Sequence, residues 1–315
     1  MTHATRVAVG VDGSASSEVA LEWALQEAAR RGWGLDVICS YSLPSFTAAS
    51  LDGGYAALDD TAIRASAQAA LDEAVAQVSD RGVEVTGRLE TGDPAGALID
   101  ATSEAGLVVI GTRGGGGFTD RLLGTVSTAV PAHAHCPVVV VPVKGRDDAQ
   151  RTPVTAPRRI VVGVDGSPSA RIALAAAIEE AVLWDAELVV VGGVPLATGS
   201  GVLPWLPANV DRAQLLADVE AGLKVVVEEV RAASGHDLAI TSRVLDGSGA
   251  ALLIEFSTAV DLVVVGSRGR GGFAGMLLGS TSQSVLHHAA CPVLVVPARI
   301  QREEGSVPGT FPWEG

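Results

Sequence analysis

Short apolar runs alternate along the chain with longer segments in which apolar side chains recur every three or four positions. Residues 6–11 and 107–110 are short runs in which apolar side chains, mainly Val, predominate, which is typical of strands buried on both faces. Residues 61–80 repeat apolar side chains at helical spacing. The expected strands of the first half are residues 6–11, 35–40, 83–89, 107–110 and 137–141. The expected helices are one capped by Ser16 or Ser17 and running to about Arg31, residues 61–80, one opening at Asp93-Pro94, and residues 125–132. This alternation predicts a parallel sheet of the α/β class.

Four blocks of the first half recur, in the same order, in the second half. The offset is 153 residues for the first block and 155 for the other three. The matched blocks are 7–14 with 160–167, 107–114 with 262–269, 121–125 with 276–280, and 136–142 with 291–297. The sequence therefore predicts a tandem duplication. We expect one domain at residues 1–143, an exposed linker at 144–157, a second domain at 158–299 and a flexible tail at 300–315.

An aspartate follows the first expected strand of each half, in the patterns Gly10-x-Asp12 and Gly163-x-Asp165. Open parallel sheets bind ligands at the carboxyl ends of their strands, so both aspartates are expected at the ligand-binding edge. A carboxylate there can accept hydrogen bonds from a ribose hydroxyl or an exocyclic amine. The alternative interpretation is an Asx turn or a helix cap with no ligand.

A glycine-rich segment follows the fourth expected strand of each half and fits Gly-x2-Gly-x9-Gly-[Ser/Thr]. Glycine lets backbone N–H groups converge on a phosphate, and the closing Gly-[Ser/Thr] opens a helix whose N-terminus attracts anions. Thr125 and Ser280 would add a hydroxyl donor or a cap, and Arg113 and Arg268 can pair with a phosphate or a neighbouring carboxylate. The alternative is a merely flexible connection, which the repeated spacing and the helix start disfavour. The candidate residues are Gly111, Arg113, Gly114, Gly115, Gly116, Gly117, Gly124, Thr125 and Val126 in the first half, and Gly266, Arg268, Gly269, Arg270, Gly271, Gly272, Gly279, Ser280 and Thr281 in the second.

Both halves resemble the universal stress protein family, in the ATP-binding branch that carries this glycine motif. The resemblance covers roughly residues 6–142 and 159–298. It implies a five-stranded, Rossmann-like parallel sheet in each half, with Asp12 and Asp165 at the adenosine and the glycine segments at the phosphates. It also implies that the last strands, residues 138–141 and 293–296, pair into an internal pseudo-dimer, and a homodimer of whole chains is a further option.

Charge and composition narrow the function classes. There are 22 basic and 36 acidic residues, a net charge of −14, which is unfavourable for nucleic-acid binding. Apolar runs fall short of the roughly 20 residues of a membrane span, and three cysteines without a C-x-x-C pair offer neither a disulfide framework nor a zinc ribbon. The histidines before Cys136 and Cys291 do not repeat as a ligand set, so we expect no metal site. These features predict a cytoplasmic protein.

The absence of two catalytic sequence motifs favours binding over catalysis. The P-loop pattern with its lysine does not occur, and neither does a His-x-x-His adenylyl-transfer signature. The leading interpretation is an ATP-binding regulatory protein of stress or dormancy responses, with Mg²⁺ accompanying the triphosphate and an unidentified protein partner. The alternatives are a slow ATPase or nucleotidyl-transfer enzyme, and a binder of another adenine nucleotide such as AMP or cyclic AMP.

Overall fold

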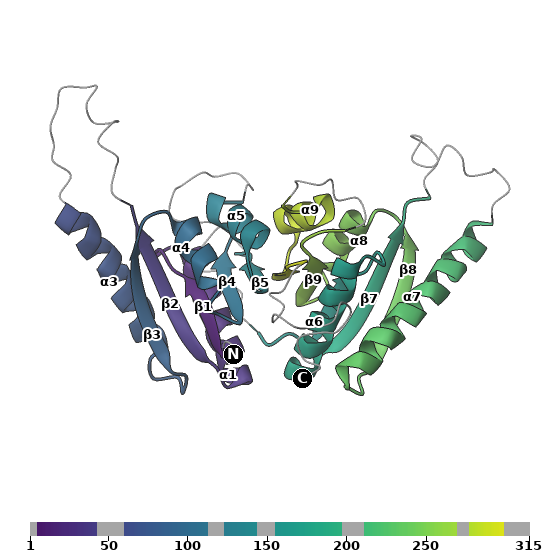
Figure 1. Ribbon diagram of the computed structural model, residues 1–315, viewed down its shortest axis with the longest axis horizontal. Coiled ribbons are helices and arrows are strands. Elements are labelled where there is room, and N and C mark those ends of the chain that lie inside the picture. Colours follow the sequence, from purple (N-terminus) through teal and green to yellow (C-terminus); the bar gives the residue numbers. More distant parts are fainter. Residues whose placement is uncertain are drawn as a thin grey trace, which may run out of the picture. The chain divides into compact units, whose positions relative to one another are not determined.

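The protein forms two compact units, Met1–Val154 and Thr155–Gly315, which we call unit 1 and unit 2 (Figure 1). The structure, a computed structural model, describes residues 5–42, 60–112, 123–143, 155–196, 211–269 and 277–298. Two predicted segments lie outside these ranges: residues 144–154 of the linker, and the tail at residues 300–315. The predicted α/β class with two tandem parallel sheets is confirmed.

Each unit repeats the same order of elements. Unit 1 contains β1 (Arg6–Gly10), α1 (Ala15–Arg31), β2 (Gly34–Tyr41), α3 (Asp60–Val78), β3 (Val85–Thr91), α4 (Pro94–Ala101), β4 (Leu107–Gly111), α5 (Thr125–His133) and β5 (Val138–Val141). Unit 2 contains β6 (Arg159–Gly163), α6 (Pro168–Trp184), β7 (Glu187–Val194), α7 (Arg212–Ser234), β8 (Ile240–Asp246), α8 (Gly249–Phe256), β9 (Leu262–Gly266), α9 (Ser280–His288) and β10 (Val293–Val296).

The strands of each unit are parallel and run in the order β3-β2-β1-β4-β5 in unit 1 and β8-β7-β6-β9-β10 in unit 2. The chain moves outward from β1 to β3 and then returns to the other side of β1. The strand order therefore reverses between β1 and β4, and between β6 and β9. Such a switch point leaves a crevice at the carboxyl ends of the two central strands, where ligands of open α/β sheets bind.

Helices cover both faces of each sheet. In unit 1, α1 and α3 pack on one face and α4 and α5 on the other, as Figure 1 shows. Residues 107–110 and 138–141 are consequently buried at every position, and their side chains are all Val, Leu or Ile. Two-sided burial explains why these strands appear in the sequence as continuous apolar runs without alternation.

The start of the first helix differs from the prediction. Ser14, not Ser16 or Ser17, caps α1: its backbone is extended, and its side chain accepts a hydrogen bond from the Ser17 backbone N–H. Ser167 caps α6 in the same way, with the Ala170 N–H as donor. The strand expected at residues 83–89 is also displaced and spans Val85–Thr91. Propensity does not separate neighbouring serines, because the cap is chosen by the backbone angle at which the chain leaves the strand.

Candidate functional site

An Asx turn follows the first strand of each unit. The Asp12 Oδ1 accepts a hydrogen bond from the Ser14 N–H at 3.0 Å, and the Asp165 Oδ1 accepts one from the Ser167 N–H at 2.9 Å. Both units therefore contain the Asx turn that the sequence analysis gave as the alternative interpretation of these aspartates. It does not exclude a ligand, because both aspartates are exposed at the end of the strand. The turn instead holds each carboxylate at the edge of the sheet.

The two ends of each glycine-rich segment are tied together by hydrogen bonds. The Gly124 N–H donates to the Thr112 carbonyl at 3.0 Å, and the Gly279 N–H donates to the Ser267 carbonyl at 2.7 Å. Each segment therefore leaves its strand and returns to the same place before it enters the helix. The intervening candidates lie outside the described residues: Arg113, Gly114, Gly115, Gly116, Gly117, Arg270, Gly271 and Gly272.

Two buried serines support this closure. The Ser127 hydroxyl donates to the Thr112 carbonyl at 2.9 Å, and the Ser282 hydroxyl donates to the Gly266 carbonyl at 2.6 Å. The sequence analysis did not single them out. The duplication could have found them, because both halves carry a serine three positions after the closing glycine.

The helix after each segment begins with a bare N-terminus. Gly124 caps α5 and Gly279 caps α9, and neither cap makes a side-chain hydrogen bond. Thr125 and Ser280 are therefore the first helical residues rather than the caps. The first N–H groups of a helix lack partners within it, and they add to the positive end of the helix dipole. This arrangement is suited to an anion such as a phosphate.

The first glycine of each motif is required by packing. A Cβ atom on Gly111 would lie 2.7 Å from the carbonyl oxygen of Ser16, and one on Gly266 would lie 3.0 Å from that of Ser169. Both serines are in the first turn of the helix after the first strand. These glycines therefore allow that helix to pack against the end of the fourth strand. This packing role is independent of any contact with a ligand.

Gly10 and Gly163 face the opposite side of the sheet. A Cβ there would lie 2.7 Å from the Leu98 side chain and 2.6 Å from the Leu253 side chain, respectively. The ends of β1 and β6 therefore need glycine for close packing on α4 and α8. Their proposed contact with the ligand stays a prediction.

In unit 2 the two features predicted from the sequence, the aspartate after the first strand and the glycine-rich segment, come together. A Cβ on Gly269 would lie 2.7 Å from the Asp165 Oδ2, so the aspartate carboxylate rests against the backbone of the glycine-rich segment. Arg268, the residue before, is exposed at the same edge. Ser280 and Thr281, in the first turn of α9, are exposed as well. The fold thus unites a carboxylate, a glycine backbone and a helix N-terminus at the switch point of unit 2.

Unit 1 places a cysteine beside its aspartate. Cys39 is almost fully buried in β2, and the pKa of its thiol is raised first by burial and then by the negative charge of Asp12. The Val11 N–H donates to the Ile38 carbonyl at 2.9 Å, which holds the end of β1 against this part of β2. The sequence analysis assigned Cys39 no neighbour, because its position follows from strand register.

We expect the thiols to be unreactive while the protein is folded. Cys39, Cys136 and Cys291 are all buried, and burial raises the pKa of Cys136 to about 12. The thiolate is the reactive form, so at both pH 7 and pH 9 labelling of Cys136 should stay far slower than that of a free cysteine, whose pKa is about 8.5. Labelling with Ellman's reagent should be at least about 100-fold slower in buffer than in guanidinium chloride. Rapid release of one equivalent from the folded protein would contradict this expectation.

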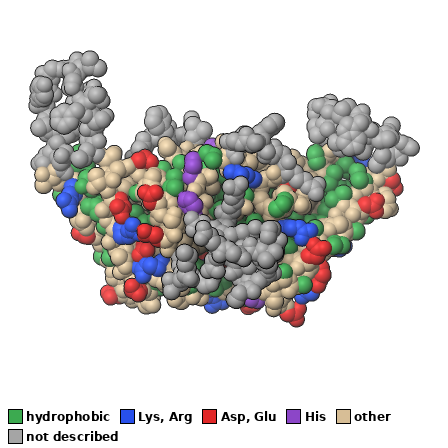
Figure 2. Space-filling model, in the orientation of Figure 1, with side chains coloured by type: hydrophobic (Ala, Val, Ile, Leu, Met, Phe, Trp, Pro, Cys, Tyr) green, Lys and Arg blue, Asp and Glu red, His purple; other side chains and the backbone are tan. Residues whose placement is uncertain are grey.

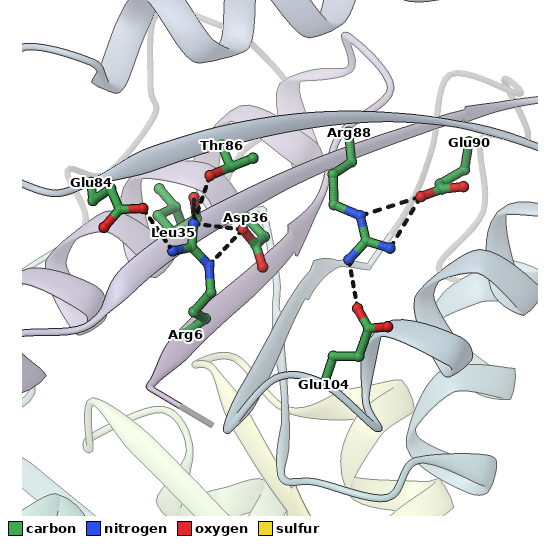
Figure 3. Close-up of polar contacts among 8 residues, drawn as sticks. All are labelled: Arg6, Leu35, Asp36, Glu84, Thr86, Arg88, Glu90 and Glu104. Atoms are coloured by element: carbon green, nitrogen blue, oxygen red, sulfur yellow. Dashed lines mark hydrogen bonds and ion pairs between the residues drawn. The ribbon is translucent and has the colours of Figure 1, made fainter. Parts of the chain in front are cut away.

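Several arginines of unit 1 are paired with carboxylates. Figure 2 shows one face of the protein, where basic side chains lie among acidic ones. In Figure 3, Arg6 bonds to Asp36 at 2.7 Å, and Arg88 contacts both Glu90 and Glu104. These pairs offset the positive charges of Arg6 and Arg88.

The sequence profile of the Universal stress protein family matches residues 3–142 and, a second time, residues 157–297. This chain belongs to the universal stress protein family. Within the described residues, the helices are too short or too polar to cross a membrane.

Two universal stress proteins of Mycobacterium tuberculosis are similar to this chain along most of its length. Rv2623 is 33% identical over 306 residues, which cover 92% of this chain and 95% of the relative. Rv2005c is 34% identical over 296 residues, which cover 92% and 96%. A universal stress protein of known structure from Archaeoglobus fulgidus shares the fold, with a TM-score of 0.65 and 21% identity over 94% of this chain and 99% of that one. The duplicated architecture therefore extends across these relatives.

Proposed function

We propose that each unit of this universal stress protein binds one ATP, with Mg²⁺, and that nucleotide occupancy regulates the protein's activity toward a partner. In this proposal Asp12 and Asp165 hold the adenosine part. The glycine-rich segments and the first turns of α5 and α9 hold the phosphates. Mg²⁺ would accompany the triphosphate to balance its charge.

The contact between Asp165 and Gly269 carries the proposal. These residues are 104 positions apart in the numbering, yet the carboxylate and the glycine backbone meet at the strand switch point. A nucleotide needs acceptors for its sugar or base and donors for its phosphates, a short distance apart. The carboxylate can supply the acceptor, and the bare helix N-terminus can supply N–H donors.

The surroundings of the site favour binding over rapid chemistry. The arrangement supplies N–H dipoles and a carboxylate, while the sequence lacks the P-loop lysine. A triphosphate can be held by such a site without being cleaved. Any turnover is expected to be slow, below about 1 per second, which is low on the scale of ordinary enzymes.

Isothermal titration of the full-length chain with Mg-ATP tests the proposal. We expect about two equivalents of ATP per chain, one for each half of the duplication. Competition with AMP and cyclic AMP identifies the phosphate requirement, and we expect ATP to bind more tightly because the segment can contact several phosphates. Phosphate release should be measured in the same samples. Binding of only AMP or cyclic AMP, or no binding at all, would overturn the assignment.

A further inference from the structure

A small cleft lies between α1 and α3 of unit 1. Its buried, apolar floor is formed by Val11, Leu21 and Ala74. Its polar rim is formed by Glu18 on α1 and by Glu73 and Gln77 on α3. The cleft holds about 30 Å³. This is enough for the end of one side chain but far below the roughly 300–1,000 Å³ of a small-molecule pocket.

Unit 2 provides an internal comparison for this cleft. The buried Leu71 and Val78 of α3 have the same spacing as the buried Leu223 and Val230 of α7, so the two helices can be aligned position by position. The first helices align through their serine caps. In this alignment Arg171 takes the place of Glu18, and Glu229 takes the place of Gln77.

A guanidinium bridges the two helices of unit 2. The Arg171 Nη1 on α6 donates to the Glu229 Oε2 on α7 at 2.8 Å. In unit 1, Glu18 and Gln77 cannot form such an ion pair. The rim of the cleft therefore carries negative charge where unit 2 carries an arginine and a carboxylate that match.

The chemistry of the cleft suits an arginine side chain from another protein. Glu73 adds a second carboxylate on the α3 side, where unit 2 has Val225. A carboxylate can accept several hydrogen bonds, and arginine combines an apolar stem for the floor with a guanidinium for the rim. Within the described ranges, His, Cys, Asp and Glu side chains do not gather in groups of three or more that could hold a metal ion. A second copy of the chain is disfavoured because each copy has a net charge of −14.

We propose that the α1–α3 cleft of unit 1 is a docking site for an arginine side chain in a basic segment of a partner protein. The inference stands without the proposed nucleotide binding. Ser17 also lines the cleft, and its hydroxyl accepts a hydrogen bond from the Asp12 N–H at 3.3 Å. The partner therefore docks beside the proposed nucleotide site of unit 1 without occupying it.

Nuclear magnetic resonance of the isotope-labelled, full-length chain tests the proposal. The protein is titrated, without nucleotide, with an amidated peptide of Arg-Gly-Ser repeats. We expect saturable shifts of the amide signals of Gly13, Ser17 and Ala70, which line the cleft. A peptide with citrulline in place of arginine has the same shape without the charge, so it should bind at least about ten-fold more weakly. Equal binding of the two peptides, or shifts spread evenly over the acidic surface, would contradict the proposal.

Variants of the rim make the test specific. Glu18→Arg combined with Gln77→Glu rebuilds the ion pair of unit 2 inside the cleft and should weaken binding of the arginine peptide at least about ten-fold. Glu73→Gln removes one exposed charge and should weaken it about three-fold. Asp80→Asn is the matched control, because it makes the same charge change at an exposed position just beyond the end of α3. It should leave the affinity for the peptide unaltered.

The remaining outcomes separate the other occupants of the cleft. Wild-type affinity for the peptide in both rim variants, with normal thermal unfolding, would overturn the proposal. Shifts of the cleft signals caused by Mg²⁺ or Ca²⁺ alone would assign the cleft to a metal ion, and shifts caused by raising the protein concentration alone would assign it to a second copy. Either result would overturn the proposal. Binding of Mg-ATP should be the same in the rim variants as in the wild type, so a failure of docking is distinguishable from a failure of nucleotide binding.

Discussion

Replacing Gly111 by alanine is expected to destabilise unit 1 by about 3 kcal/mol, the upper part of the usual range for an overpacked core. The new Cβ would lie 2.7 Å from the carbonyl oxygen of Ser16 and 2.9 Å from its carbonyl carbon. Both atoms belong to the backbone of the first turn of α1, so they cannot turn aside as a side-chain tip would. The helix must shift from β4, which is buried on both faces. Urea unfolding followed by circular dichroism should show a lower midpoint for this variant.

Gly222→Ala is the matched control, with the opposite expected sign. Gly222 lies within α7, and a Cβ there would meet no atom within 4 Å. Alanine is the better helix former, so this variant should gain roughly 0.5–1 kcal/mol. If Gly111→Ala unfolds at the wild-type midpoint, the close packing of α1 on the end of β4 is not a constraint on the fold.

Replacing Gly269 by alanine is expected to weaken ATP binding at unit 2 by at least about ten-fold, which corresponds to about 1.4 kcal/mol. The added Cβ would lie 2.7 Å from the Asp165 Oδ2 and would displace that carboxylate. Asp165 is exposed and can move, so the free energy of unfolding should change by less than about 1 kcal/mol. In a titration with Mg-ATP, one of the two sites should be weakened by at least about ten-fold and the other should keep its wild-type affinity.

Gly249→Ala provides the control for this prediction. Gly249 begins α8 in the same unit, and the nearest atom to its Cβ would be a methyl carbon of Thr281 at 4.0 Å, an ordinary contact. Both sites should therefore keep their wild-type affinities. Retention of both affinities in Gly269→Ala would show that the position of Asp165 does not govern binding.

Local patterns along the chain predicted much of the architecture. The apolar runs of β4 and β5 indicated strands buried on both faces, and the structure confirms them. The boundaries were less predictable: α1 is capped by Ser14 rather than Ser16 or Ser17, and β3 lies two residues later than expected. Those limits depend on the backbone path between elements, which neighbouring residue types do not encode.

The candidate site was predicted in composition but not in the role of each residue. The glycine motif was found from its spacing, yet Gly111 and Gly266 are required by contacts with Ser16 and Ser169, far away in the sequence. Cys39 was missed for the same reason, whereas the duplication could have revealed the closing serines, Ser127 and Ser282. A steric contact between distant segments has no local signature.

The sequence alone determined the duplication, the alternation of strands and helices, the acidic charge and the glycine motif. These features follow from residue type and period, which act over a few neighbouring positions. Only the tertiary structure decided that Asp165 lies against Gly269, and that the Ser17 hydroxyl braces Asp12 in unit 1. The first contact arises because the reversal of strand order brings separate loops to one edge of the sheet, and the second depends on the path of the turn after β1. The two halves share a motif, but the contacts around Asp12 and Asp165 differ.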